Sequence, residues 1–114
     1  MSAKRLCYAC DLVDNRELIE QYKSYHSKEN AWPEITKSIK DSGIIDMEIY
    51  LFANRLFMIM EVNETYTPER KQEMDAANPK VQEWENLMWQ FQQAPPGAKE
   101  GEKWLPMEQI YKLP

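Results

Sequence analysis

Residues 44–62, IIDMEIYLFANRLFMIMEV, decide the fold of this chain. Two runs rich in strand-forming residues, 44–52 and 56–62, flank the short polar turn Ala53-Asn54-Arg55. Apolar runs separated by a short polar turn are typical of a β-hairpin. We therefore expect two adjacent antiparallel strands here.

The two faces of this hairpin differ in character. Strand side chains alternate between faces, so Met47 lies on one side of its strand with Ile49, and Glu48 lies on the other with Tyr50. Residues 56–62 alternate only weakly between apolar and polar types. This pattern predicts a central strand that is covered on both faces.

The residues before the hairpin predict a strand followed by a helix. Residues 4–13 are rich in strand formers. Asp14 has the character of a helix N-cap, with Glu17 three residues later as in a capping box. Tyr22 and His26 then fall on one face of the expected helix.

Proline and glycine mark the boundaries of the remaining elements. Pro33 suits the first turn of a second helix, which should stop at Gly43. After the hairpin, a helical region should run from about 68 to 93 with a break near Asn78-Pro79. Residues 104–114, WLPMEQIYKLP, have the pattern of an edge strand.

The expected order is therefore β-α-β-β-α-β, the ferredoxin-like α+β arrangement, with an antiparallel sheet and helices on one face. At 114 residues, one domain spanning 1–114 is expected. The other sheet face needs a cover, because an exposed aromatic and Met-rich face favours aggregation. A homodimer packed sheet against sheet is the solution we expect.

Composition excludes several classes of function. The net charge is −5, which disfavours a nucleic-acid partner, because phosphate binding needs clustered Lys and Arg. No apolar run approaches the roughly 20 residues that span a bilayer, and the N-terminus lacks the pattern of a signal peptide. We therefore expect a cytoplasmic protein with no membrane or nucleic-acid partner.

Cys7 and Cys10 form a CxxC match. In a strand the two side chains would point to opposite faces, and three residues of strand span roughly 10 Å, which is beyond disulfide reach. We interpret both as structural thiols. With one His in the chain, an ordinary zinc site is not expected either.

His26 is the only imidazole, and therefore the first candidate for proton transfer near neutral pH. It could equally be a surface residue at a helix C-terminus. Tyr22 could donate a hydrogen bond to a ligand or fill the core. Trp32 could stack on a ligand or hold the loop, and Trp84 lies on the apolar stripe of its helix, where a core position is the alternative.

Three carboxylates are further candidates. Glu48 shares a strand face with Tyr50. Glu61 follows an apolar run, and if its carboxyl group is buried there, burial would raise the pKa of Glu61. Glu34 is placed in the first turn of a helix, where the dipole favours it. No Ser-His-Asp set, phosphate-binding glycine loop or metal triad can be assembled from the sequence.

Four segments together resemble the L-rhamnose mutarotase family, and more closely its L-fucose mutarotase-like branch. They are YKSYHSKENAWPEI, SGIIDMEIYLFANRLFMIMEV, QEWENLMWQF and the C-terminal EQIYKLP, and they span nearly the whole chain. The most specific part is Tyr-x-x-x-His followed by Trp-Pro-Glu. The resemblance implies a dimeric α/β barrel of ferredoxin-like subunits that needs no cofactor.

The resemblance also implies roles for individual residues. His26 matches the family's proton-donating histidine and Tyr22 its sugar-contacting tyrosine. Trp84 matches the first of two adjacent tryptophans near the sugar, whereas the second is Glu85 here. Met47 stands where the family has a tyrosine. These two departures suggest a reshaped pocket that suits another deoxy-hexose, such as L-fucose.

Mutarotation suits these residue types, because it only moves protons to and from a hemiacetal. The expected substrate is a free monosaccharide, L-fucose or L-rhamnose, and the expected site comprises His26, Tyr22, Trp32, Trp84, and the pair Met47 and Glu48. Two alternatives remain at this stage. One is a sugar or small-molecule sensor without catalysis, and the other is a cofactor-free monooxygenase or haem-degrading enzyme on the same fold.

Overall fold

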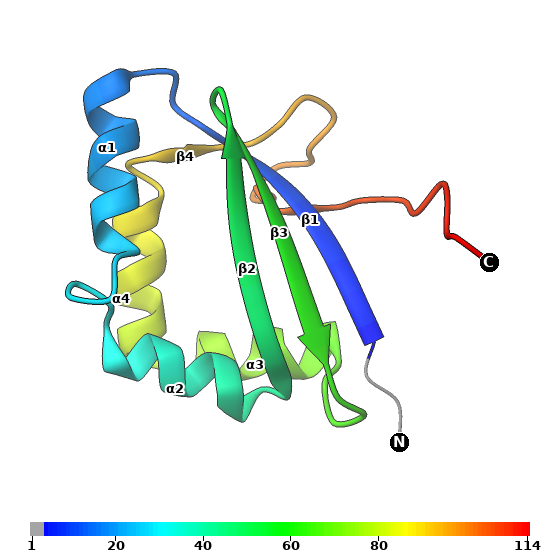
Figure 1. The fold of residues 1–114 in the computed structure, drawn as a ribbon. Coiled ribbons are helices and arrows are strands. Elements are labelled where there is room, and N and C mark those ends of the chain that lie inside the picture. The colour runs from blue at the N-terminus through cyan, green and yellow to red at the C-terminus, as the bar shows by residue number, and fades with distance from the viewer. Residues whose placement is uncertain (1–3) are drawn as a thin grey trace.

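We describe the fold from a computed structural model, which covers residues 4–114 (Figure 1). Its elements, in chain order, are β1 (Lys4–Leu12), α1 (Arg16–Tyr25), α2 (Pro33–Asp41), β2 (Ile44–Phe52), β3 (Arg55–Val62), α3 (Pro68–Ala76), α4 (Pro79–Met88), β4 (Gln92–Gln93) and β5 (Leu105–Pro106). The architecture is a mixed α+β fold.

All strands pair antiparallel, in the order β2-β3-β1-β4, with β5 also on β1. This order fits the ferredoxin-like arrangement, with each helical crossover split in two. The β2–β3 hairpin forms as expected, and its turn is tight, because Ala53 adopts a positive φ of 54°. The mixed fold and antiparallel sheet predicted from the sequence are confirmed.

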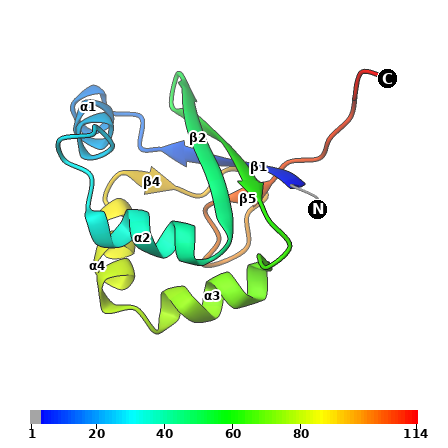
Figure 2. The same cartoon turned by 60° about the horizontal axis from the view of Figure 1, so that its bottom comes forward.

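The helices lie on one side of the sheet in both views (Figures 1 and 2). The side chains between the two layers form two core clusters. The first contains Cys10, Leu12, Tyr22, Leu56, Met88 and Phe91. The second contains Ile44, Met60 and Val62. We call this side of the sheet the helix face and the other side the open face.

Within residues 4–114, the open face carries no helix, as the two views show (Figures 1 and 2). β3 is central, as expected, but its outward residues Phe57 and Ile59 are only half-buried. On β2, Tyr50 is 55% exposed and Phe52 is 84% exposed. The cover expected for the second face of β3, a second subunit or a ligand, stays a prediction, because helices α1 to α4 all pack on one side.

Helix boundaries agree with the sequence at α2 and differ at α1. Pro33 opens α2, and Gly43 follows its end with φ +100°. A Cβ at Gly43 would come within 2.7 Å of the Thr65 hydroxyl, so both the backbone angle and the space require glycine there. The N-cap of α1 is Asn15 rather than Asp14, because the Asn15 side chain accepts the hydrogen bond from the Leu18 N–H.

Two C-terminal predictions are wrong in their extent. The last helix ends at Met88, and Gln92–Gln93 pair with β1 instead of continuing it. Only Leu105–Pro106 of the expected 104–114 strand pair with β1. Residues 107–114 carry no regular structure. The Met107 N–H still donates to the Cys7 carbonyl oxygen at 2.8 Å, and the chain beyond it extends away from the body of the protein (Figure 1). We call residues 107–114 the C-terminal tail. Pro106 already limits the pairing of this segment, since it has no N–H to donate.

Among the described residues, no helix combines the length and the apolar character that crossing a membrane requires.

Candidate functional site

His26 stands where α1 ends. It is the C-cap residue, and its ring Nδ1 lies 2.8 Å from the backbone carbonyl oxygen of Tyr22. The chain then turns, with the Asn30 amide donating to the Ser24 carbonyl oxygen at 2.9 Å, before Pro33 opens α2. This local structure holds the imidazole at a fixed place beside the loop.

The hydrogen bond to Tyr22 defines the tautomer of the neutral ring. A carbonyl oxygen can only accept a hydrogen bond, so the proton of the neutral imidazole sits on Nδ1 of His26. Nε2 then keeps a free lone pair. An imidazole held in this way can act as a general base without first losing a proton.

Aromatic side chains surround the imidazole. The ring centroid of Tyr22 lies 4.3 Å from that of His26, and the Trp84 ring meets the imidazole edge at 5.5 Å. Trp32 packs on Trp84 at 5.0 Å. The structure therefore brings together four of the residues named from the sequence, from α1, the following loop and α4.

A cavity of about 180 Å³ opens beside His26, between α1 and the β2–β3 hairpin. Its lining residues are Tyr22, Lys23, His26, Ile49, Tyr50, Leu51 and Leu56. Pockets for drug-sized ligands measure about 300–1,000 Å³, so this one suits a smaller molecule. Trp32 and Trp84 do not line it; Trp84 packs against His26, and Trp32 packs against Trp84.

The local surroundings set the protonation of both groups at the cavity. Desolvation lowers the pKa of His26 below its ordinary value, although the Tyr22 carbonyl opposes this effect and the residue as a whole is exposed to solvent. Desolvation also raises the pKa of Tyr22, which is 3% exposed. At neutral pH the site therefore presents a neutral imidazole and a protonated phenol.

The other two predicted site residues lie elsewhere. Met47 is on the helix face but packs against the second core cluster, beside Met60. Glu48 pairs with Ile59, points from the open face and is not among the residues that line the cavity. Strand alternation alone did not decide between Met47 and Glu48, because consecutive residues of β2, Ile49 to Leu51, line the cavity.

Two more carboxylates singled out from the sequence are also remote. Glu34 lies exposed in the first turn of α2, as its position after Pro33 predicted. Glu61 pairs with Arg5 across the open face. Glu85, which stands where the resembling family has a tryptophan, forms an ion pair of 2.8 Å with Lys103 and does not line the cavity.

Sequence reasoning missed the apolar wall of the cavity and one polar residue. Ile49 and Leu51 follow Met47 at every second position, so strand alternation could have identified them as neighbours of the site. Gln92 is 5% exposed, and its side-chain amide lies 3.1 Å from the Tyr22 hydroxyl. No sequence signal pointed to Gln92, because its segment was interpreted as the end of a helix.

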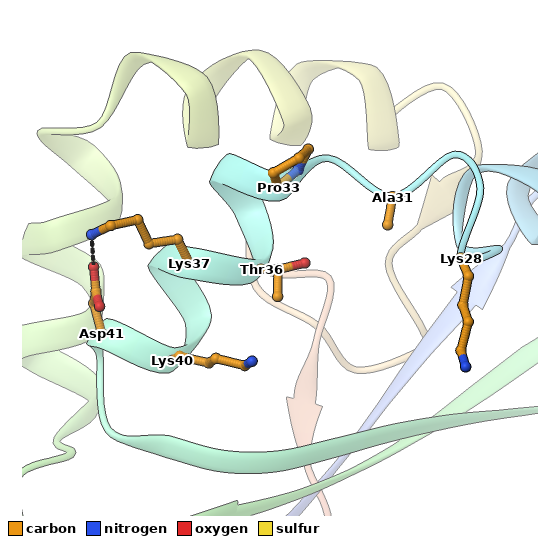
Figure 3. A pocket seen from close by; sticks show the side chains of 7 residues that line it. All are labelled: Lys28, Ala31, Pro33, Thr36, Lys37, Lys40 and Asp41. Carbon is orange, nitrogen blue, oxygen red and sulfur yellow. Dashed lines mark hydrogen bonds and ion pairs between the residues drawn. The ribbon is translucent and has the colours of Figure 1, made fainter.

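A larger hollow of about 490 Å³ lies on the outer side of α2 (Figure 3). Its side chains come from α2 and the loop before it, and only Lys37 is joined to a partner there, Asp41, at 2.6 Å. Lys28 and Lys40 extend separately from the surface. The lining contains no histidine, tyrosine or tryptophan, so we do not place the site there.

The thiols of the CxxC match lie on opposite faces, as predicted. Cys7 pairs with Ile59 on the open face, whereas Cys10 is fully buried in the first core cluster. Both are free, and burial raises the pKa of the Cys10 thiol to about 12. Within residues 4–114, no three His, Cys, Asp or Glu side chains gather closely enough to hold a metal ion.

Comparison with known proteins gives a consistent result. Residues 5–113 match the sequence model of the L-rhamnose mutarotase family. The L-fucose mutarotase of Xanthomonas campestris pv. campestris is 45% identical over 113 residues, which cover 99% of this chain and 90% of that protein. A Dictyostelium discoideum protein whose name states no activity is 40% identical over 114 residues, covering 96% of this chain and 90% of that protein.

A solved structure shares the fold. The crystal structure of L-rhamnose mutarotase from Formosa agariphila superposes with a TM-score of 0.70, at 23% identity, and covers 97% of this chain and 99% of that one. At this identity the likeness concerns the fold alone.

Proposed function

The chain belongs to the L-rhamnose mutarotase family and is a sugar mutarotase, and from that premise we propose that it interconverts the α and β anomers of a free 6-deoxy-hexose, with His26 as the proton-transfer group. We propose L-fucose as the preferred substrate, because the relative at 45% identity is an L-fucose mutarotase. L-Rhamnose is the second candidate.

One observation carries the proposed site. The only imidazole of the chain lines a cavity while its Nδ1 is bonded to the carbonyl oxygen of Tyr22, at 2.8 Å. This arrangement leaves Nε2 of a neutral His26 free to accept a proton at neutral pH. Mutarotation needs such a base next to a pocket the size of a monosaccharide.

The reaction then follows from proton movement alone. His26 removes the proton of the anomeric hydroxyl, the bond between the anomeric carbon and the ring oxygen breaks, and the ring oxygen gains a proton. The open-chain aldehyde rotates about the bond next to its carbonyl group and closes on the other side by the reverse steps. A positioned proton transfer contributes about 10²–10⁴-fold to the rate.

We also propose how the site favours a 6-deoxy-sugar. Ile49, Leu51 and Leu56 form an apolar wall of the cavity, which suits the methyl group of L-fucose. L-Galactose is the same sugar with a hydroxyl on that carbon. An apolar pocket rejects an added hydroxyl by a factor of about 10² at most, so we expect weaker but measurable exchange with L-galactose.

NMR exchange spectroscopy tests the proposed function. Catalytic amounts of the protein should speed the exchange between the anomeric proton signals of L-fucose, and His26→Ala should reduce this acceleration by about 10²-fold or more. Lys40→Ala, in the larger hollow of Figure 3, is the matched control and should keep full activity. A protein that accelerates no sugar in a panel of L-fucose, L-rhamnose and L-galactose would contradict the proposal.

We further propose a homodimer in which two open faces pack together. The support is the apolar surface that this face leaves uncovered, with Phe52 84% exposed and Tyr50 55% exposed. The C-terminal tail adds Ile110, Tyr111 and Leu113, which are 89%, 70% and 76% exposed. Apolar surface of this extent is typical of a protein–protein contact.

We propose the cytoplasm as the location. Two free thiols, one of them partly exposed at Cys7, suit a reducing compartment.

A further inference from the structure

The hydroxyl of Tyr22 has an unusual partner in the core. Gln92, in β4, donates a hydrogen bond from its side-chain Nε2 to the Tyr22 hydroxyl oxygen at 3.1 Å, and both groups are buried. The phenol oxygen is therefore the acceptor in this contact. Within residues 4–114 the Tyr22 hydroxyl makes no other hydrogen bond, so its own proton is free for a different acceptor.

The Gln92 side chain keeps a second unsatisfied group. Its Oε1 is buried and has no hydrogen-bond partner within the described part of the chain. If the amide were turned over, Oε1 would accept from Tyr22 and Nε2 would be left without a partner instead. Either orientation leaves one buried amide group unpaired, which is costly. An apolar side chain at this position, which pairs with Leu12, would avoid that cost.

The hydrogen-bonded pair Tyr22 and Gln92 lies close to His26. Tyr22 and His26 line the same cavity, and their ring centroids lie 4.3 Å apart. The two oxygens that exchange protons in mutarotation, the anomeric hydroxyl and the ring oxygen, are bonded to the same carbon. Two proton-carrying groups this close together can therefore serve the two oxygens of one hemiacetal.

We propose that Gln92 is a positioning residue that holds the Tyr22 phenol with its O–H turned toward the cavity, where it donates to the ring oxygen of the sugar while His26 accepts from the anomeric hydroxyl. This inference rests on the proposed function. As the ring carbon–oxygen bond breaks, the phenol proton moves to the ring oxygen, and the Gln92 N–H stabilises the phenolate that forms. Ring closure returns both protons.

A double-mutant cycle tests the coupling between Gln92 and Tyr22. Gln92→Met keeps the length of the side chain and removes its hydrogen bond, and Tyr22→Phe removes the hydroxyl. With L-fucose, Gln92→Met should lower kcat by roughly 10–100-fold, the loss expected for a hydrogen bond to a developing charge. KM should change less than twofold. In the Tyr22→Phe background, Gln92→Met should have no further effect.

A purely structural role would give a different result. If Gln92 only packs the core, its substitution lowers kcat by the same factor with and without the Tyr22 hydroxyl, and the losses multiply. That outcome would overturn the inference. A wild-type protein that catalyses no exchange would instead remove the proposed function itself, so the two failures are distinguishable.

Gln92→Glu gives a second readout that does not depend on stability. At neutral pH its carboxylate would accept the Tyr22 proton and turn the hydroxyl away from the sugar. We expect this variant to gain activity as pH is lowered and the carboxyl is protonated, whereas the wild type, which needs neutral His26, loses activity in the same direction. Parallel profiles for the two proteins would contradict the assignment.

Discussion

The two faces of the sheet are built from alternate residues of the same strands, yet their surroundings differ completely. On the helix face, Leu56 is 2% exposed and Met60 is 5% exposed, whereas Phe52 on the open face is 84% exposed. Both faces carry large apolar residues, although the open face also carries charged ones such as Glu48 and Glu61. The helices decide which face becomes the core, and the cavity beside His26 forms at the rim of that covered face.

The two faces of the sheet therefore have different roles. The helix face supplies stability and, at its rim, the site. The open face supplies little to the fold of a single chain and is available to a partner. Substitutions on the two faces should therefore differ in their effects on reactivity, stability and assembly as much as the two faces differ in exposure.

The largest difference is expected between the two thiols of β1. Burial raises the pKa of Cys10 to about 12 from a usual value near 9, which leaves about 10³-fold less thiolate at neutral pH. Cys7, on the open face, is partly exposed. In dilute native protein, iodoacetamide should therefore modify Cys7 at least about 10³-fold faster than Cys10, and mass spectrometry can follow both sites.

The single-thiol variants Cys7→Ser and Cys10→Ala separate the two rates. In denaturant the two thiols should react alike, which provides the control. If both thiols of the native protein react at similar rates, local unfolding exposes Cys10 far more often than its packing indicates.

The next effect concerns neighbouring residues of β3. Met60→Ala should lower the free energy of unfolding by about 2–5 kcal/mol, because it leaves a cavity in the second core cluster. Ile59→Ala should cost no more than about half as much in dilute protein, since Ile59 is already half-exposed. Urea unfolding measures both.

Protein concentration sharpens this prediction. If a second copy covers the open face, the cost of Ile59→Ala should rise with concentration, because unfolding then also separates the dimer. The cost of Met60→Ala should change much less. If Ile59→Ala and Met60→Ala lower the free energy of unfolding equally at all protein concentrations, the two faces do not differ in their contribution to stability.

The sequence predicted the sheet well because its signals are local. The hairpin at 44–62, the break before Pro79 and the stop at Gly43 depend on residues within one or two turns of each other. The end of the fold was harder. Gln92–Gln93 pair with β1 through tertiary contact alone, and nothing in a two-residue strand distinguishes it from a helix end.

The site was partly predictable for the same reason. Tyr22 and His26 share a helix face by spacing, so their proximity follows from the sequence. The approach of Trp84 from α4 requires the packing of distant helices, and only the resemblance to a known family suggested it. The Gln92 contact with Tyr22 joins residues 70 positions apart, and no pattern encodes it.

A smaller effect is expected from the pH dependence of His26. Desolvation lowers the pKa of its imidazole below 6.5, so a neutral base is present at pH 7. The kcat/KM for L-fucose should be level near neutral pH and fall about tenfold per pH unit below the pKa of His26. A midpoint above 6.5 would contradict the lowering of this pKa by desolvation.

The free energy of unfolding should also depend on the protonation of His26, and it should decrease as the pH is lowered. The unfolded chain has the higher histidine pKa, so it binds the proton first as pH falls below about 6.5. The contribution of His26 is therefore fully present above that pH and declines on acidification, until the folded protein is protonated as well. The difference between wild type and His26→Gln, measured by thermal unfolding across this range, isolates the effect.

The smallest effect on folding stability is expected from a substitution on the open face. Such a substitution separates the stability of one chain from the association of two chains. Phe52→Ser removes an exposed ring, so the unfolding free energy of the isolated chain should change by no more than about 0.5 kcal/mol. Sedimentation equilibrium should nevertheless show a dimer at least about tenfold weaker, because the ring would leave an apolar contact between two copies. Lys40→Ser, on α2, is the matched surface control and should change neither quantity. A dimer that survives Phe52→Ser unchanged would show that the two sheets do not meet through this ring, and deletion of the C-terminal tail would then test the remaining apolar surface as the contact.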